Sequence, residues 1–285
     1  MSEHHEDSEI EGSRAPLMEH LVELRKRLIM SLLAYGVAIV ICYFFSQTLF
    51  TLILHPFNVA EGVVAQAKSG TKHGPFDMLL ILMGILPAPP FKPAVMYFTA
   101  PLEAFLTYLK LSAIAGLVLA FPVVGYQLYR FIAPGLYKRE RNAFLPFLIA
   151  SPVLFIMGAA LVYYVMLPFV MVFSLNQQIG GVAEYLPRVG DYLKLATGLV
   201  LAMGICFQLP VVLTLLGMAG LISSATLISG WRYAIVGVFA VAAVVTPPDP
   251  ISMLSLAFPI CLLYFVSVWC VKMVEGRRDK DEASA

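Results

Sequence analysis

Charged residues are scarce in this 285-residue chain, which is 13% charged and 60% hydrophobic. Its uncharged stretches are far longer than the ~18 apolar residues that indicate a membrane-spanning helix, and this excludes a water-soluble globular domain. The sequence therefore predicts an all-α integral membrane protein. The formal net charge is only +1, so the overall charge gives no reason to expect a nucleic-acid partner.

Motifs for nucleotide, metal or peptide chemistry are also missing. The four cysteines lie inside apolar stretches without a CxxC spacing, which favours neither a disulfide nor a metal site. No Walker, GxGxxG, HExxH or GxSxG pattern occurs. His4 and His5 lack further ligands at a defined spacing, so a solvated tail is the simpler interpretation. We therefore expect no cofactor and no bound metal.

Six apolar stretches predict six transmembrane helices, since a helix rises ~1.5 Å per residue and the bilayer core is ~30 Å thick. The spans are placed at about residues 28–54, 111–132, 143–167, 195–219, 233–246 and 251–271. They form a membrane domain over residues 18–272. We expect a disordered acidic tail at 1–17 and a charged tail at 273–285. Residues 55–110 form a long loop between the first two spans.

The fifth stretch, residues 233–246, is short because Arg232 precedes it and TPPDP follows. It would reach only ~21 Å as a helix, less than the bilayer core. One interpretation is a hairpin that enters the membrane and returns. The other is a short pair of spans that thins the bilayer locally, at a fraction of a kcal/mol per Å of mismatch. We favour the short pair.

Basic residues predict the orientation. With both ends of the chain in the cytoplasm, thirteen of the nineteen basic residues lie on the cytoplasmic side. Short cytoplasmic loops carry an excess of Lys and Arg, so this division predicts an N-in, C-in topology. The loop at 55–110 is then periplasmic. Its segment MLLILMGIL is too short to span and is expected to form a surface or re-entrant helix.

Two glutamates lie inside basic clusters on the predicted cytoplasmic side. Glu23 precedes three bases in HLVELRKRL, and Glu140 lies within YKRER. The bases explain the orientation, but the glutamates need another reason. One is a local ion pair, because Glu23 and Arg27 are four residues apart on a helix. The other is an acidic pocket for a cationic peptide, in which carboxylates accept paired hydrogen bonds from guanidinium groups. Charge alone favours the local pair.

Gln208, within FQLP, is the most conspicuous polar side chain inside the predicted spans. An interhelical hydrogen bond worth ~0.6 kcal/mol and a functional contact are both open for it. The spans otherwise carry almost no ionisable side chain, which argues against a proton path built from several carboxylates. After the short fifth span, we expect a polar external rim that a partner helix can use, formed by Thr246, Asp249 and Ser252.

Five segments resemble, in order, the signature segments of the TatC family, the receptor subunit of the twin-arginine protein translocase. They are HLVELRKRL, TAPLEAFLTYLKL, YQLYRFIAPGLYKRER, FQLP and TPPDP, and the resemblance covers about residues 18–271. It implies a concave, glove-shaped bundle of six helices whose cytoplasmic face binds signal peptides with consecutive arginines. It also implies that the signal-peptide-binding residues are Glu23, Arg25, Phe131 and Glu140.

The resemblance implies the setting as well. Members of this family pass folded proteins across the bacterial cytoplasmic membrane with the proton-motive force and are not enzymes. The implied partners are single-span TatA-like and TatB-like proteins in an oligomeric complex, with membrane lipid and without nucleic acid. Two positions depart from the family, because Gln208 and Phe265 stand where many members carry glutamate. We therefore expect hydrogen bonding at Gln208 but no proton transfer.

Two other classes of function compete with this interpretation. An ion-coupled small-molecule permease would gather charged groups near the middle of the membrane and often shows inverted repeats. This sequence has neither feature and carries its charges at the cytoplasmic rim instead. A structural scaffold for membrane assembly would not require the two acidic sites, but nothing in the sequence excludes it.

Overall fold

The computed structural model describes residues 3–68, 77–87, 96–98, 100–132, 141–176, 188–246 and 250–283. Within these ranges the chain is helical, and the extended pairing is a single bridge between Tyr97 and Arg188. This confirms the all-α prediction. Helices suit a membrane chain because they satisfy every backbone hydrogen bond within one segment.

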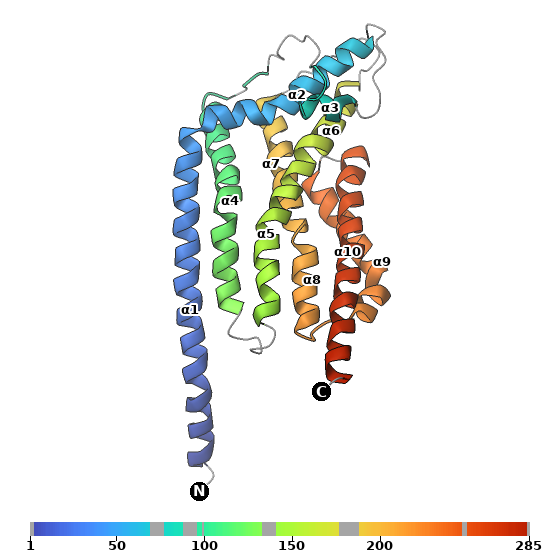
Figure 1. Ribbon diagram of the computed structural model, residues 1–285. Helices are drawn as coiled ribbons and strands as arrows, with labels where there is room; N and C mark the ends of the chain where they lie inside the picture. Colours follow the sequence, from blue (N-terminus) through green and yellow to red (C-terminus); the bar gives the residue numbers. More distant parts are fainter. Residues whose placement is uncertain are drawn as a thin grey trace.

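Figure 1 labels the helices in chain order. They are α1 (Glu3–Phe44), α2 (Ser46–Lys68), α3 (Asp77–Leu82), α4 (Glu103–Ile132), α5 (Arg141–Leu161), the π-helical turn η2 (Val162–Met166), α6 (Leu167–Asn176), α7 (Val189–Cys206), α8 (Leu209–Met218), α9 (Ser224–Val245) and α10 (Pro250–Ala283). Seven helical stretches in the described part of the chain are long and apolar enough to cross a membrane. The protein is therefore a multi-pass membrane protein.

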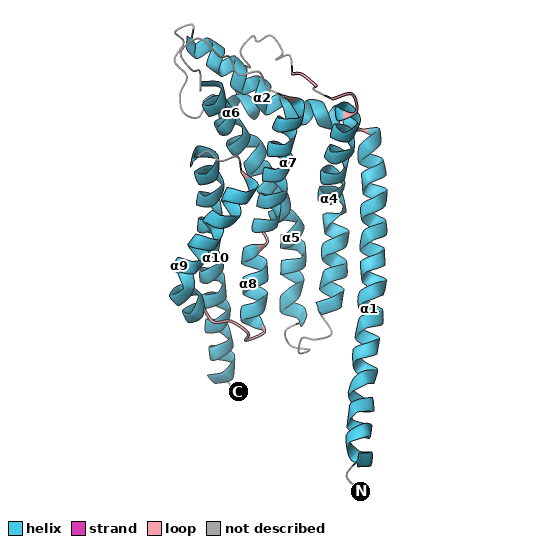
Figure 2. Ribbon diagram, turned by 180° about the vertical axis from the view of Figure 1, so that it is seen from behind, coloured by secondary structure: helices cyan, strands magenta, loops and turns pink. Residues whose placement is uncertain are grey.

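One of these seven stretches, α2, differs from the others in direction. Figures 1 and 2 show α2 running across one end of the bundle, whereas α1, α4, α5, α7, α8 and α10 run along it. The start of α1 and the end of α10 lie at the opposite end (Figure 1). The continuous helix α5–η2–α6 packs against α7 along α5 and against α2 along α6.

The first predicted span, residues 28–54, is wrong at its end. The helix stops at Phe44, bends at Phe45 and resumes as α2 at Ser46, so the chain changes direction inside an uncharged stretch. Hydropathy reports apolar length but not direction, and for this reason the bend was not predicted. The expected disordered tail at 1–17 also differs, because α1 is helical from Glu3.

The last two helices are not short. Helix α9 has 22 residues and begins at Ser224, where the Ser223 side chain accepts a hydrogen bond from the backbone N–H of Thr226 at 3.1 Å. Arg232 therefore lies within the helix, and its exposed guanidinium group lies 5.8 Å from the centre of the Trp231 ring. A long Arg side chain can extend along an apolar surface to reach water. The length argument for local thinning of the membrane is thus wrong.

The core of the bundle is built around α7. Tyr192, Leu199 and Met203 are at most 2% exposed, and the Tyr192 hydroxyl donates to the Ile53 carbonyl of α2 at 2.5 Å. Helix α5 approaches α7 closely, because a Cβ on Gly158 would lie 2.8 Å from the Met203 carbonyl oxygen. Interhelical contact through small residues is the usual way for membrane helices to pack.

The start of α4 is tied to the start of α7 by Glu103. One carboxylate oxygen of Glu103 accepts from the backbone N–H of Gly190 at 3.2 Å, and the other accepts from the N–H of Ala100 at 3.1 Å. These bonds use N–H groups that lie before or at the beginning of a helix. Glu103 therefore fixes the outer pair α1–α4 to the core at the end of the bundle where α2 lies.

Candidate functional site

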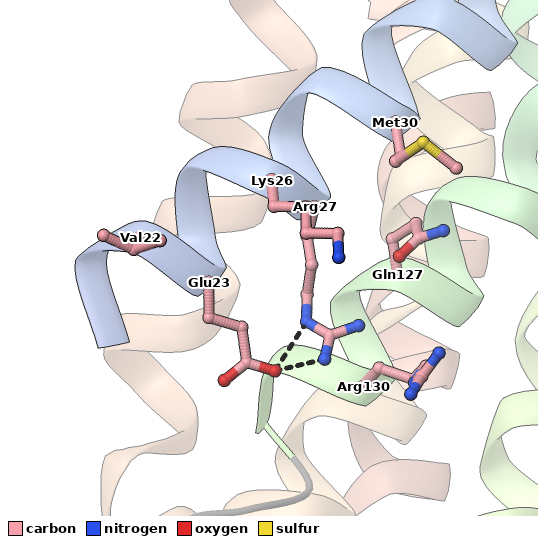
Figure 3. A pocket seen from close by; sticks show the side chains of 7 residues that line it. All are labelled: Val22, Glu23, Lys26, Arg27, Met30, Gln127 and Arg130. Carbon is pink, nitrogen blue, oxygen red and sulfur yellow. Dashed lines mark hydrogen bonds and ion pairs between the residues drawn. The ribbon is translucent and has the colours of Figure 1, made fainter. Parts of the chain in front are cut away.

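A pocket of about 530 Å³ lies between α1 and the last turn of α4 (Figure 3). Helix α1 contributes side chains three or four residues apart, which share one face of a helix. Helix α4 contributes two side chains three residues apart. The lining consists of Val22, Glu23, Lys26, Arg27, Met30, Gln127 and Arg130. Its residues lie in the middle part of α1 and near the end of α4. Figure 1 shows that α4 ends on the same side of the bundle as α10.

Glu23 and Arg27 form an ion pair inside this pocket. The Arg27 Nε donates to Glu23 Oε1 at 3.1 Å, and Arg27 Nη2 donates to the same oxygen (Figure 3). The Glu23 side chain is 33% exposed and the Arg27 side chain 15%. The local pair expected from the four-residue spacing is therefore present. It also holds the Glu23 carboxylate toward the pocket, where an incoming cation can reach it.

Positive charge dominates the rest of the pocket. Neither Lys26 nor Arg130 is joined to a carboxylate among the residues that the structure describes, and both side chains are exposed. The Arg130 guanidinium carbon lies 5.9 Å from the centre of the Tyr126 ring, within range of a cation–π interaction. Among the described residues, the lining thus carries three cations and one carboxylate.

The structure brings together only part of the predicted peptide-binding set. Glu23 lines the pocket, whereas Arg25 is exposed on α1 outside the lining and Phe131 is half-buried next to Arg130. Glu140 lies outside the described residues. Sequence reasoning missed Gln127 and Arg130. Their spacing of three within YQLYR was a signal for one helix face, but the pairing of α4 with α1 was not predictable from it.

Gln208 lies where the helix α7–α8 is interrupted. The helix breaks at Phe207 and Gln208 and resumes two residues before Val211, with Pro210 in its first turn. The Gln208 side chain accepts from the Ser151 hydroxyl at 2.6 Å and donates to the Ser151 carbonyl at 3.0 Å. The oxygen and the nitrogen of the side-chain amide are both hydrogen-bonded, so Gln208 links the break between α7 and α8 to α5.

The polar rim expected after α9 is not exposed at the two positions that the structure describes. Thr246 is 6% exposed and donates to the Ala242 carbonyl of its own helix at 2.8 Å, and Ser252 is fully buried. Asp249 lies outside the described residues. Both described side chains are therefore buried within the chain, and their use by a partner helix stays a prediction.

Metal ligands do not gather at any of these places. In the described ranges, no three His, Cys, Asp or Glu side chains form a group that could hold a metal ion. What the pocket offers is hydrogen bonding and charge. It can bind a charged group at one end of a helix pair whose remaining surface is apolar.

Fold and pocket together define a multi-pass helical membrane protein that presents a charged pocket at the edge of its bundle. The family model described as Sec-independent protein translocase protein (TatC) matches residues 19–259. A protein named TatC from Magnetococcus marinus is 41% identical over 271 residues, covering 95% of this chain and 89% of the relative. One from Desulforapulum autotrophicum is 34% identical over 275 residues, covering 96% and 91%.

A solved structure agrees with these relatives. A crystal structure of the twin-arginine translocase receptor TatC superposes with a TM-score of 0.70 at 29% identity, covering 90% of this chain and 99% of that one. The chain belongs to the TatC family of Sec-independent protein translocase proteins. The resemblance found in the five sequence segments is thereby confirmed, and the permease alternative loses its support.

Proposed function

We propose that this chain is the signal-peptide receptor and core subunit of a twin-arginine translocase. It would export folded proteins across the bacterial cytoplasmic membrane with the proton-motive force, in a transport role without catalysis. Family membership supports this function, as does the receptor structure to which the chain is similar. The observation that carries the proposal is the Glu23 carboxylate in an open pocket at the edge of the bundle.

The proposed topology has six membrane crossings with both ends in the cytoplasm. Of the seven candidate stretches, α2 is the least apolar and runs across the bundle, so we assign it to the membrane surface. The remaining six connect the start of α1 and the end of α10 at one end of the bundle (Figure 1). The basic residues favour this end as the cytoplasmic one.

Binding would proceed by exchange of one guanidinium group for another. In the structure Arg27 bonds Glu23 Oε1 through two nitrogens, and an arginine of the signal peptide can take over the same bonds. Arg27 would then turn away, so the exchange replaces one charge-assisted pair with another. Glu140 would supply the second carboxylate for the second arginine, while Arg25 and Phe131 would contact the peptide beside the pocket.

The test is the affinity of the purified protein in detergent for a signal peptide with an arginine pair and for its lysine-pair analogue. A hydrogen bond to a charged group contributes ~1.5 to 3 kcal/mol, so Glu23→Gln and Glu140→Gln should each weaken arginine-peptide binding roughly 10- to 100-fold. The lysine peptide should bind less tightly to the wild type, because an ammonium group lacks the planar fork of donors.

A matched control is Asp191→Asn, which removes an exposed carboxylate from the first turn of α7 outside the pocket. It should leave the affinity unchanged. Equal affinity of the wild type and both glutamine variants would contradict the acidic site. Failure to distinguish arginine from lysine peptides would do the same.

A contact with a TatA-like or TatB-like partner helix at Thr246, Asp249 and Ser252 remains part of the proposal. Because the Thr246 and Ser252 side chains are buried, Asp249 would have to provide the polar contact. A cysteine at Asp249 should form a disulfide with a cysteine in the partner helix, and a cysteine at Ser252 should not. Crosslinking from Ser252 alone would contradict this assignment.

A further inference from the structure

The charged pocket continues into an apolar groove along the seam between α1 and α4. A second cavity of about 480 Å³ lies against α1 from Met30 to Ile41 and against the facing part of α4. Met30 and Gln127 line both cavities, so the two are neighbours along the seam. Apart from Gln127, the side chains that line the groove are apolar. The seam thus has a charged pocket at one end and an apolar groove along the rest of the two facing helices.

The groove forms because small side chains lie beside a close contact between α1 and α4. A Cβ on Gly116 of α4 would lie 2.9 Å from the backbone nitrogen of Ile39, and the Tyr35 hydroxyl donates to the Ala113 carbonyl at 3.2 Å. The two helices are therefore held together. Ala34 and Ala120 leave space beside this contact. A space lined by apolar atoms loses dispersion contacts unless something fills it.

The length of the groove matches one leaflet of a membrane. Met30 and Ile41 are eleven residues apart, which is ~17 Å along a helix. The hydrocarbon core of a bilayer is ~30 Å thick, so the groove reaches from one boundary to about the middle. A single acyl chain covers the same depth, whereas a helix that crosses the membrane would continue beyond it.

The charge at the end of the groove selects the kind of lipid. Among the described residues, Lys26, Arg27 and Arg130 share the pocket with one carboxylate, Glu23, and of the three cations Arg27 is the one paired with it. A phosphate accepts hydrogen bonds from both Arg and Lys, and basic pockets between membrane helices bind anionic headgroups. We propose that the seam binds one anionic phospholipid, with its phosphate against Lys26 and Arg130 and one acyl chain in the groove.

Lipid and signal peptide should depend on Glu23 in opposite ways. Replacing Glu23 by Gln removes the negative charge that the described residues contribute to the pocket lining, so it should tighten the binding of an anionic lipid. The same change should weaken an arginine peptide if the proposed function holds. The lipid site does not rest on the proposed function, and the opposite signs separate a failure of one from a failure of the other.

The experiment is native mass spectrometry of the purified chain in a neutral detergent. It is titrated with phosphatidylglycerol, with phosphatidylcholine of identical acyl chains, and with glycerophosphoglycerol, which has the headgroup but no chains. We expect one phosphatidylglycerol per chain at concentrations where the other two do not bind. The Lys26→Gln/Arg130→Gln double variant should weaken this binding roughly 10- to 30-fold.

Matched controls use exposed positions outside the seam. Lys272→Gln/Arg232→Gln removes two exposed cations, one of them also beside an aromatic ring, and should leave lipid binding unchanged. Val37→Trp should block the groove, whereas Val40→Trp, on the same helix but outside the lining, should not. Equal retention of both phospholipids would overturn the proposal. Equal effects of a seam variant and its control would overturn it too.

Discussion

The core around α7 and the outer seam between α1 and α4 are packed in different ways. Side chains of α7 are enclosed on several sides by α4, α5 and α10, and Met203 is completely buried. The Tyr192 hydroxyl of α7 also reaches α2. Helix α1 touches mainly α4, and most of its apolar side chains face outward, among them Leu32 at 66% exposed. The core therefore holds the bundle together. The seam is closely packed at Gly116, and the groove lies beside this contact, where the side chains of Ala34 and Ala120 are small.

The largest expected effect tests the tightness of the core. Gly158→Ala adds a Cβ that would lie 2.8 Å from the Met203 carbonyl oxygen, so α5 and α7 must move apart. Overpacking of this kind costs about 1 to 3 kcal/mol. A clear fall in the thermal unfolding midpoint in detergent is expected.

Its matched control is Gly36→Ala on α1, where a Cβ meets nothing within 4 Å. Stability should stay unchanged or rise slightly, because alanine is the better helix former. If both alanine variants lowered the unfolding midpoint equally, the close approach of α5 and α7 at Gly158 would not account for the loss.

A smaller effect is expected at the interruption between α7 and α8. Gln208→Leu removes both hydrogen bonds to Ser151 and should cost about 0.6 to 2 kcal/mol, within the range found for polar contacts between membrane helices. Gln208→Glu keeps an acceptor for the Ser151 hydroxyl and should cost less.

Unfolding midpoints of Gln208→Leu, Ser151→Ala and the double variant measure the coupling. The double variant should cost less than the two single variants added together, because Ser151→Ala already removes one of the two bonds. Strict additivity would contradict the contact.

The smallest expected effect on stability concerns the seam. Arg27→Gln breaks the ion pair with Glu23, which as a pair four residues apart on a helix is worth only about 0.2 to 0.5 kcal/mol. The unfolding midpoint should hardly change. Arginine-peptide affinity should rise, since the peptide no longer competes with Arg27. A stability loss as large as that of Gly158→Ala would place the seam among the structural parts of the bundle.

The predictable features were those that depend on neighbours along the chain. Uncharged stretches indicated the helices, and the spacing of Glu23 and Arg27 indicated their ion pair. The bend at Phe45 was missed because both sides of it are apolar. The start of α9 was missed because Arg232 served as a boundary, although its side chain is exposed along the helix.

The composition of the pocket depends on contacts that are distant in sequence. Glu23 and Arg130 lie more than a hundred residues apart and meet only because α1 packs along α4. The same holds for Ser151 and Gln208, whose hydrogen bonds join α5 to the interruption of α7–α8. A single sequence, read without an alignment, carries no signal for such pairings. Helix faces can be read from it, but the partner of each face cannot.

The π-helical turn at Val162–Met166 lies between two parts of one continuous helix that pack against different neighbours. A π-helical turn holds one residue more than an α-helical turn, so it rotates the part that follows by about 100° around the helix axis. Before it, α5 presents Gly158 to α7; after it, α6 presents Leu167 and Val170 to the region of α2. Deleting one residue here would restore an unbroken α-helix and turn α6 out of phase with α2. The single additional residue sets the angular offset between the two contact faces.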